Sequence, residues 1–336
     1  MSSILANFSP TQVAALSTAQ IHSLKAADWA GLSTAQANVL SSSQLAAITP
    51  STIVSISTAA IAALQSTSLA GLSNTEVASL TSGQVSALDT GALSSGQLGA
   101  LSASSVAGLS TTDINGLSSS QLPGLSAKEV AALSSTQVGA LSSSQVPLLS
   151  STQVGALSAS QYEALNTALT STQLSSLSAH TLGGLSTAAI HALTSSQIPG
   201  LGATQIAALS SSQVAALNTG SLSSGQLGAL SVTALAGLST ADINALSSTQ
   251  LQGLSAKEVA ALSTTQVDAI ATSQIQSLPL GDVKALTTAQ ITAMTTGQVS
   301  NFSTSQLAAL AYAQVEALTS NQLAALSSNQ IQALAV

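Results

Sequence analysis

The residues that could do chemistry are few and far apart along the chain. Three histidines, His22, His180 and His191, lack the H-x-x-x-H or H-E-x-x-H spacing of zinc sites. Serine is abundant, but no G-x-S-x-G segment marks one serine as a nucleophile. No D-x-D calcium loop, P-loop or G-x-G-x-x-G segment occurs. The sequence therefore predicts no enzyme, no cofactor and no metal site.

One charged segment occurs twice and could mark a duplicated site. LSAKEVAALS stands at 125–134 and again at 254–263, in a chain whose four basic residues are all lysines. The decapeptide lies inside a longer duplication, residues 88–141 and 217–270. Duplication of the block explains both copies. Lys128 and Lys257 then remain as rare positive charges that could contact acidic positions of a neighbouring copy.

Composition and charge exclude several classes of partner. Charged residues make up 4% of the chain and the net charge is −7, so no basic patch could bind nucleic acid. No apolar run approaches the roughly 18 residues of a membrane helix, which predicts no membrane insertion. The N-terminal sequence has no basic segment and no continuous apolar segment, so no cleavable Sec-type signal peptide is visible. A hydrophobic content of 45% argues against disorder.

A repeat fills almost the whole chain. Residues 8–333 divide into 39 octads of the form L-S-x-x-Q-V-x-A, which we number by positions 1 to 8. Three short units interrupt them, at 88–92, 165–168 and 217–221. We predict one continuous solenoid domain over 8–333, with a lead-in at 1–7 and a tail at 334–336.

Each octad carries the signals of a short capped helix. Ser or Thr at position 2, followed three residues later by Gln or Glu at position 5, is a capping box. The apolar residues at positions 1 and 6 have the spacing of a hydrophobic staple. We expect these two positions to form the core and positions 3, 4 and 7 to face outward. Position 5 also holds seven of the eleven acids, which we expect to act as caps: Asp28, Glu76, Asp113, Glu129, Asp242, Glu258 and Asp282.

Two other folds compete with this interpretation. A continuous helix would turn the leucine row by about 80° per octad, because eight residues at 100° each exceed two turns by that angle. No stable apolar stripe would then result, so we reject it. A β-solenoid remains the alternative, although Ala at positions 7 and 8 is poor strand material. The predicted fold class is an all-α solenoid of short capped helical turns, forming an elongated superhelical rod.

The tandem L-S/T-x-x-Q-V/I-x-A octads resemble the repeat tracts of large bacterial surface and secreted proteins of the adhesin-like type. The resemblance implies an extracellular or cell-surface location and a mechanical or adhesive role. We therefore expect a structural protein that stacks end to end into an extracellular filament or matrix, with itself as the partner. An adhesin stalk that contacts a cell surface or polysaccharide is the alternative, and ice binding is a more remote one.

Six residues are candidate self-assembly contacts. Solenoid ends leave apolar rows uncovered, and the last octad, LSSNQIQA, keeps the full consensus without a polar cap. Trp29 stands at position 6, where a core role is the simpler interpretation. The candidates are Phe8, Trp29, Lys128, Lys257, Leu326 and Ile331.

Overall fold

The structure is a computed structural model that describes residues 3–165 and 169–334. The chain divides into two compact units, Met1–Leu177 and Ser178–Val336, each of which we describe by itself. Most of the predicted short unit 165–168 lies outside the described residues. One copy of the duplicated block falls in each unit, so the two copies can be compared directly.

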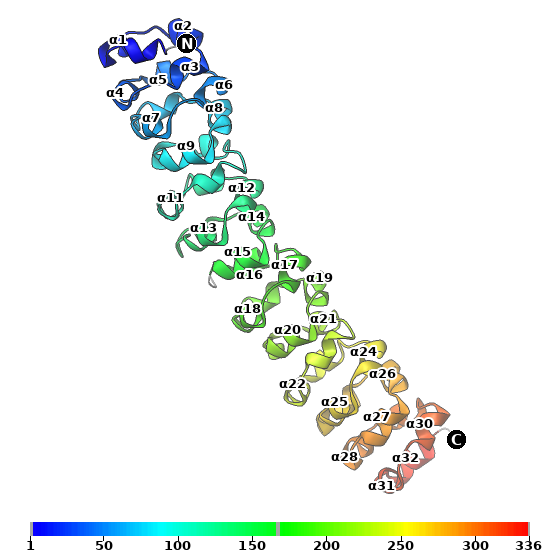
Figure 1. Cartoon of the computed structure of the whole chain (residues 1–336). Coiled ribbons are helices and arrows are strands. Elements are labelled where there is room, and N and C mark those ends of the chain that lie inside the picture. The colour runs from blue at the N-terminus through cyan, green and yellow to red at the C-terminus, as the bar shows by residue number, and fades with distance from the viewer. Residues whose placement is uncertain (1–2, 166–168, 335–336) are drawn as a thin grey trace. The chain divides into compact units, whose positions relative to one another are not determined.

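The first unit is a succession of short α-helices and 3₁₀ helices (Figure 1). Its helices are η1 (Leu5–Asn7), α1 (Pro10–Ala14), α2 (Thr18–Ser23), α3 (Ala26–Trp29), α4 (Thr34–Ala37), α5 (Ser42–Leu45), α6 (Pro50–Ile53), α7 (Thr58–Ala62), η2 (Leu69–Gly71), α8 (Asn74–Ser79), α9 (Ser82–Ala87), η3 (Thr90–Ala92), α10 (Ser95–Leu98), η4 (Val106–Gly108), α11 (Thr111–Gly116), η5 (Leu122–Gly124), α12 (Ala127–Ala132), α13 (Ser135–Gly139), η6 (Val146–Leu148), α14 (Ser151–Gly155), α15 (Ala159–Ala164) and α16 (Ser171–Leu174).

The second unit has the same construction. Its helices are α17 (Ala179–Gly183), α18 (Thr187–His191), η7 (Ile198–Gly200), α19 (Ala203–Ala207), α20 (Ser211–Ala216), η8 (Thr219–Ser221), α21 (Ser224–Leu227), η9 (Ala234–Gly237), α22 (Thr240–Ala245), α23 (Ser248–Leu251), α24 (Ala256–Ala261), α25 (Thr264–Asp268), η10 (Thr272–Ser277), α26 (Leu280–Ala285), α27 (Thr288–Ala293), α28 (Thr296–Ser300), α29 (Thr304–Ala308), α30 (Tyr312–Glu316), α31 (Ser320–Ala324) and α32 (Ser328–Ala333). The described ranges of the two units contain no strand, so the β-solenoid alternative is wrong there.

The predicted capping boxes form the start of most α-helices. At α14, the Ser150 backbone N–H donates to Gln153 Oε1 at 2.8 Å, and the Gln153 N–H donates to Ser150 Oγ at 3.3 Å. The backbone of Ser150 is extended, so this residue separates α14 from the helix before it. Because the N-cap recurs with each octad, no helix within residues 3–165 or 169–334 continues across an octad boundary, and the rejection of a long helix is confirmed there.

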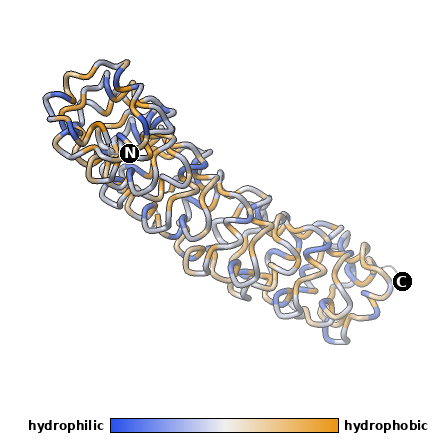
Figure 2. The backbone as a smooth tube through the Cα atoms, turned by 45° about the horizontal axis from the view of Figure 1, so that its top comes forward, coloured by the Kyte–Doolittle hydropathy of each residue, from blue (hydrophilic) through white to orange (hydrophobic). Residues whose placement is uncertain are grey.

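Within each unit the helices pack as a solenoid. In the first unit α7 packs against α9 and α13 against α15; in the second, α18 packs against α20 and α25 against α27. Successive turns thus lie side by side, three to four octads apart along the chain. Position 6 residues are almost fully buried and position 1 residues are exposed by only a few per cent over most of the chain. Figure 2 shows the result as frequent alternation of hydrophobic and hydrophilic stretches along the backbone.

Glycine at position 8 lets neighbouring turns approach closely at several octads, both 3₁₀ and α-helical. A Cβ at Gly71, the last residue of η2, would lie 1.9 Å from the Ser42 carbonyl oxygen. A Cβ at Gly253 would lie 2.2 Å from the Ser224 oxygen. At both glycines, backbone atoms of the adjacent turn occupy the space that a side chain would need, so the glycine sets a tighter contact between turns.

A pair of glycine substitutions tests this packing. We expect Gly253→Ala to lower the free energy of unfolding by about 1–3 kcal/mol, because the new methyl group would push two turns apart. Gly225→Ala should instead stabilise the chain by about 0.5–1 kcal/mol, since nothing lies within 4 Å of its Cβ position inside α21. Denaturant titration followed by circular dichroism measures both. Equal effects of the two substitutions would contradict the close approach at Gly253.

Candidate functional site

The position 5 glutamines connect successive turns of the solenoid. Gln84 accepts a hydrogen bond from the Thr81 N–H at Oε1, and its Nε2 donates to the carbonyls of Ile53 and Ile56, each at 2.9 Å. The two carbonyls lie 31 and 28 residues earlier, at positions 6 and 1 of the preceding turn. The same bonds recur in both units, and we call this series the glutamine ladder.

The glutamine ladder solves a problem that short helices create. An α-helix leaves its first four N–H groups and last four carbonyls without internal partners, which is most of the backbone in helices this short. Gln290 illustrates the solution: it caps the Thr287 N–H at 2.7 Å and donates to Val259 and Leu262 at 2.9 and 2.7 Å. It is only 1% exposed, so these bonds are shielded from water.

The sequence contained a signal for this ladder that capping alone does not use. Glutamate caps a helix as well as glutamine does, yet position 5 holds Gln in 25 octads and Glu in three. Only the amide has a nitrogen that can donate to the preceding turn. The excess of Gln over Glu is therefore explained by the bond between turns.

Substitution of Gln290 separates the two roles of the side chain. Gln290→Glu keeps the cap acceptor but loses the donor, so we expect a loss of about 1–2 kcal/mol in the free energy of unfolding. Gln290→Leu loses both and leaves buried backbone groups unpaired, so its loss should be larger, about 2–4 kcal/mol. Chemical denaturation at neutral pH measures the series. An equal loss in both variants would show that the donor contributes nothing.

A carboxylate at position 5 cannot donate to the carbonyls of the preceding turn. At three of the seven acids, a hydrogen-bond donor from another turn bonds to the carboxylate instead. Asp113 and Asp242 occupy corresponding places in the duplicated block, and each accepts a hydroxyl bond at 2.8 Å, from Thr90 and Thr219 respectively. These threonines belong to the short units 88–92 and 217–221, at which η3 and η8 form. The short units therefore supply the donor that a carboxylate needs, and they recur together with the aspartates.

Hydrogen bonds also lower the pKa of two aspartates at position 5, Asp242 and Asp28. Burial acts to raise the pKa of Asp242, but bonds from the Ser239 and Thr219 hydroxyls and the Ser239 N–H outweigh it and lower the pKa. Asp28 accepts the N–H groups of Ile4 and Lys25 at 2.9 Å each, which lowers its pKa. Such carboxylates are stable as anions in the folded chain.

The other four acids at position 5 lack a hydroxyl or N–H donor from another turn among the hydrogen bonds of the described residues. Glu76, Glu129 and Glu258 each use one oxygen to cap their own helix, and their residues are 3–5% exposed. Asp282 has no cap to make, because Pro279 at position 2 lacks an N–H, and its Oδ2 is buried without a partner. Burial raises the pKa of Asp282, and the nearby Glu258 carboxylate adds to the rise. Here the glutamine ladder is interrupted.

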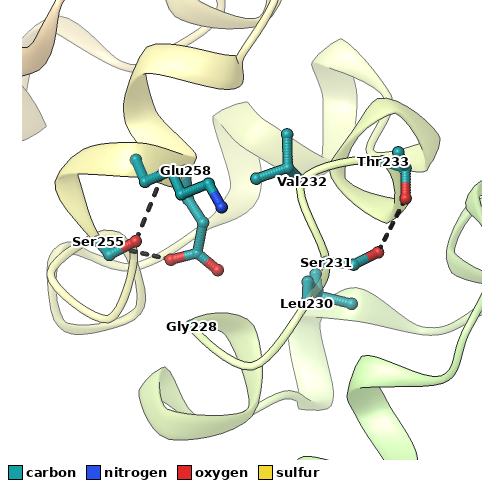
Figure 3. A pocket seen from close by; sticks show the side chains of 8 residues that line it. Gly228, Leu230, Ser231, Val232, Thr233, Ser255 and Glu258 are labelled. Atoms are coloured by element: carbon teal, nitrogen blue, oxygen red, sulfur yellow. Dashed lines mark hydrogen bonds between the residues drawn. The ribbon is translucent and has the colours of Figure 1, made fainter.

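Glu258 also lines an open pocket of about 440 Å³ in the second unit (Figure 3). The Ser255 N–H donates to one carboxylate oxygen at 2.6 Å, and the other oxygen points away from Ser255. Lys257, from the duplicated decapeptide, is exposed and lines the same pocket. The described ranges contain no cluster of three or more metal-ligating side chains here or elsewhere.

Glu76 provides the simplest test of an interrupted ladder. Desolvation raises its pKa against the bonds from Ser73, so the protonated form is favoured by folding. Its contribution to stability is present below the unfolded-state pKa and is lost as the pH rises through the raised folded-state pKa. Glu76→Gln supplies the missing donor toward Leu45 and Ile48, the residues 31 and 28 earlier, and should add about 1 kcal/mol at neutral pH.

We expect the advantage of Glu76→Gln to shrink as the pH falls and Glu76 becomes protonated. Thermal melting of both proteins across acidic and neutral pH measures the difference. Glu316→Gln is the matched control, because Glu316 is an exposed position 7 residue. A Glu76→Gln advantage that stays constant with pH would contradict this account of the carboxylate.

Side chains at position 7 form a second, outer series of bonds between turns. His22 Nδ1 lies 3.2 Å from the Ala47 carbonyl oxygen, and His191 Nδ1 lies 3.2 Å from that of Ala216. Asn115 and Asn244 donate in the same way to carbonyls 25 residues later. His22 and His191 thus occupy structural positions, while His180 is an exposed position 4 residue.

The six candidate assembly residues occupy three kinds of site. Trp29 is fully buried and Leu326 is 9% exposed, so both contribute to the core. Phe8 is half-buried and Ile331 is 43% exposed. The remaining two, Lys128 and Lys257, are exposed on their helices, away from the terminal turns. Whether any of the six makes an assembly contact stays a prediction.

The terminal turns expose complementary rows. At the N-terminal turn, position 6 is fully buried (Val13, Ile21) whereas position 1 is half-buried in Phe8, Leu16 and Leu24. We call these three position 1 residues, with Gln12 and Gln20, the N-terminal face. At the C-terminal turns the pattern is reversed.

Position 1 is buried at the C-terminal turns, where Leu318 and Leu326 are 6% and 9% exposed. Position 6 is half-buried in Val315 and Leu323 and exposed in Ile331. These three position 6 residues, with the carbonyls around them, are the C-terminal face. The preceding turn therefore covers position 1 and the following turn covers position 6.

Comparison with known proteins agrees with the repeat analysis. The family model of the ALTTAQ repeat matches residues 91–127, 220–256 and 280–312, which together make up less than half of the chain. The first two matches are the corresponding parts of the duplicated block. No curated protein matches the chain. Among the described residues, no helix has the length and apolarity to cross a membrane.

Proposed function

We propose that the protein is a self-assembling structural subunit, in which the N-terminal face of one copy stacks on the C-terminal face of another. The observation that carries the proposal is the reversal of burial between the terminal turns. Position 1 is half-buried at the N-terminal face, and position 6 is half-buried or exposed at the C-terminal face. A second copy supplies each with the covering that every interior turn has.

Such a junction is heterologous, because two different faces meet. Heterologous contacts produce rings where the rotation closes and open filaments where it does not. A solenoid turn stacked on another continues the same superhelical operation, so the assembly extends as a filament. An extracellular or cell-surface place for this filament rests on the resemblance of the octads to bacterial surface-protein repeats.

Outward hydroxyl groups favour a second role, as an adhesin stalk or surface-binding module. Ser102 and Ser104 lie with their Oγ atoms 3.0 Å apart, and Ser142 and Ser144 at 2.9 Å. These pairs occupy positions 2 and 4 on the exposed surface and recur in both units. Paired hydroxyls can donate to and accept from a polysaccharide, so a filament with this surface could also adhere.

Electron microscopy and sedimentation of the purified chain test the assembly. We expect filaments whose length grows with protein concentration, and only monomers for Ile331→Glu, which places a charge on the C-terminal face. Val54→Glu is the matched control, because Val54 is also 43% exposed but lies at an outward position 7. Monomers of the unmodified chain at every concentration and pH, or equal loss in both variants, would contradict the proposal.

A further inference from the structure

We infer that the glutamine ladder continues across the junction between two copies, in one register that pairs Gln12 with Val315 and Leu318 and pairs Gln20 with Leu323 and Leu326. The inference rests on the proposed stacking and adds to it the donors, the acceptors and their alignment. The partner is a second copy of this chain.

The donors lie on the N-terminal face. Gln12 and Gln20 cap their own helices, accepting from the Ser9 and Ser17 N–H groups at 2.7 and 2.9 Å. Both side chains are exposed, and Nε2 of each makes no hydrogen bond in the structure. In the interior, the corresponding nitrogen of Gln44 donates to Val13 and Leu16 at 2.9 Å each. The N-terminal face therefore presents two ladder donors without acceptors.

The acceptors lie on the C-terminal face. Gln322 reaches the carbonyls of Ile291 and Met294, and Gln330 reaches those of Ser300 and Phe302. No glutamine within the described ranges reaches four of the position 6 and position 1 carbonyls that follow Leu310 in the chain. These are the carbonyls of Val315, Leu318, Leu323 and Leu326.

The register follows from the way the lead-in joins the ladder. Gln36 donates to Leu5 and Phe8, 31 and 28 residues earlier, so Leu5 stands at position 6 of an octad that precedes Phe8. Leu5 is 0% exposed, as other position 6 residues are. Leu334 stands at position 1 in the same repeat frame and is buried. In the octad frame, position 1 lies five residues before Leu5. Placing Leu334 of the first copy at that position of the second copy aligns the two faces.

This alignment provides acceptors for both donors. Counting 31 and 28 residues back from Gln12 in the joined frame gives Val315 and Leu318, and counting from Gln20 gives Leu323 and Leu326. It also brings Gln332 to the Ser23 carbonyl of the second copy, as Gln252 donates to Ser277 at 3.1 Å within the chain. The half-buried position 1 and position 6 rows meet in the same alignment.

Engineered cysteines can read this register, because the chain has no cysteine of its own. Position 7 and the position 8 that lies 25 residues later come close in neighbouring turns: a Cβ at Gly139 would lie 3.5 Å from the Ala164 Cβ. Disulfides need a Cβ separation of about 3.5–4.5 Å. Across the junction, the corresponding pair is Ala324 of one copy and Ala15 of the next, and both are exposed in the single chain.

We expect the double variant Ala15→Cys with Ala324→Cys to form a disulfide-linked series of multimers on mild oxidation, seen on a non-reducing gel. Ala15→Cys with Ala308→Cys is the matched control, since Ala308 has the same octad position two repeats out of register. It should cross-link at least tenfold more slowly. Preferential cross-linking of the control, or equal cross-linking of both, would overturn the register while leaving assembly itself intact.

A second pair of variants tests the donors. Gln12→Glu with Gln20→Glu keeps both caps but removes both Nε2 donors, and should weaken association about thirtyfold, as measured by sedimentation. Thr11→Glu with Thr18→Glu adds the same charge beside the donors and should weaken it much less. Equal weakening would overturn the ladder at the junction. Absence of filaments in the unmodified chain would instead overturn the proposed function.

Discussion

The structure depends on the position 5 glutamine, whose side chain pairs with both ends of the short helices. Its oxygen accepts the N-cap N–H of its own octad, and its nitrogen donates to carbonyls of the preceding turn. Helices of four to six residues could not persist in water, because nucleation is costly and most of their backbone groups lack internal partners. The glutamine ladder ties each helix to a turn some 28 residues away, so the octads are stable only as a stack.

The exceptions follow from the same interaction. A carboxylate keeps the cap but cannot donate, so it needs another donor or a proton. Asp113 and Asp242 obtain the donor from Thr90 and Thr219 in the short units. The 129-residue duplication therefore preserves a matched pair of features, and no catalytic constellation is needed to explain it. Glu76 has no such donor, which is why its burial raises the pKa.

Sequence alone predicted the part of the fold that is local. Octad boundaries, capping boxes and the buried rows at positions 1 and 6 depend on residues within eight of one another, and all three are confirmed. The spacing between turns and the partner of the glutamine Nε2 depend on residues 28 to 31 apart, which no local pattern encodes. The excess of Gln over Glu was the one compositional signal of that contact. The face-to-face reversal of burial at the terminal turns also required coordinates, because Phe8 and Ile331 follow the same consensus as buried residues.

The most direct test of the central claim is hydrogen exchange of the glutamine side-chain amides, measured by NMR on chain labelled with nitrogen-15 at glutamine. The account predicts strong protection of Nε2 hydrogens in the buried ladder, including those of Gln84 and Gln290. In monomeric chain, Gln12 and Gln20 should exchange as fast as glutamine in a short peptide, since their Nε2 atoms have no acceptor. Uniformly fast exchange of all glutamine side chains would contradict the claim that their amides hold the turns together.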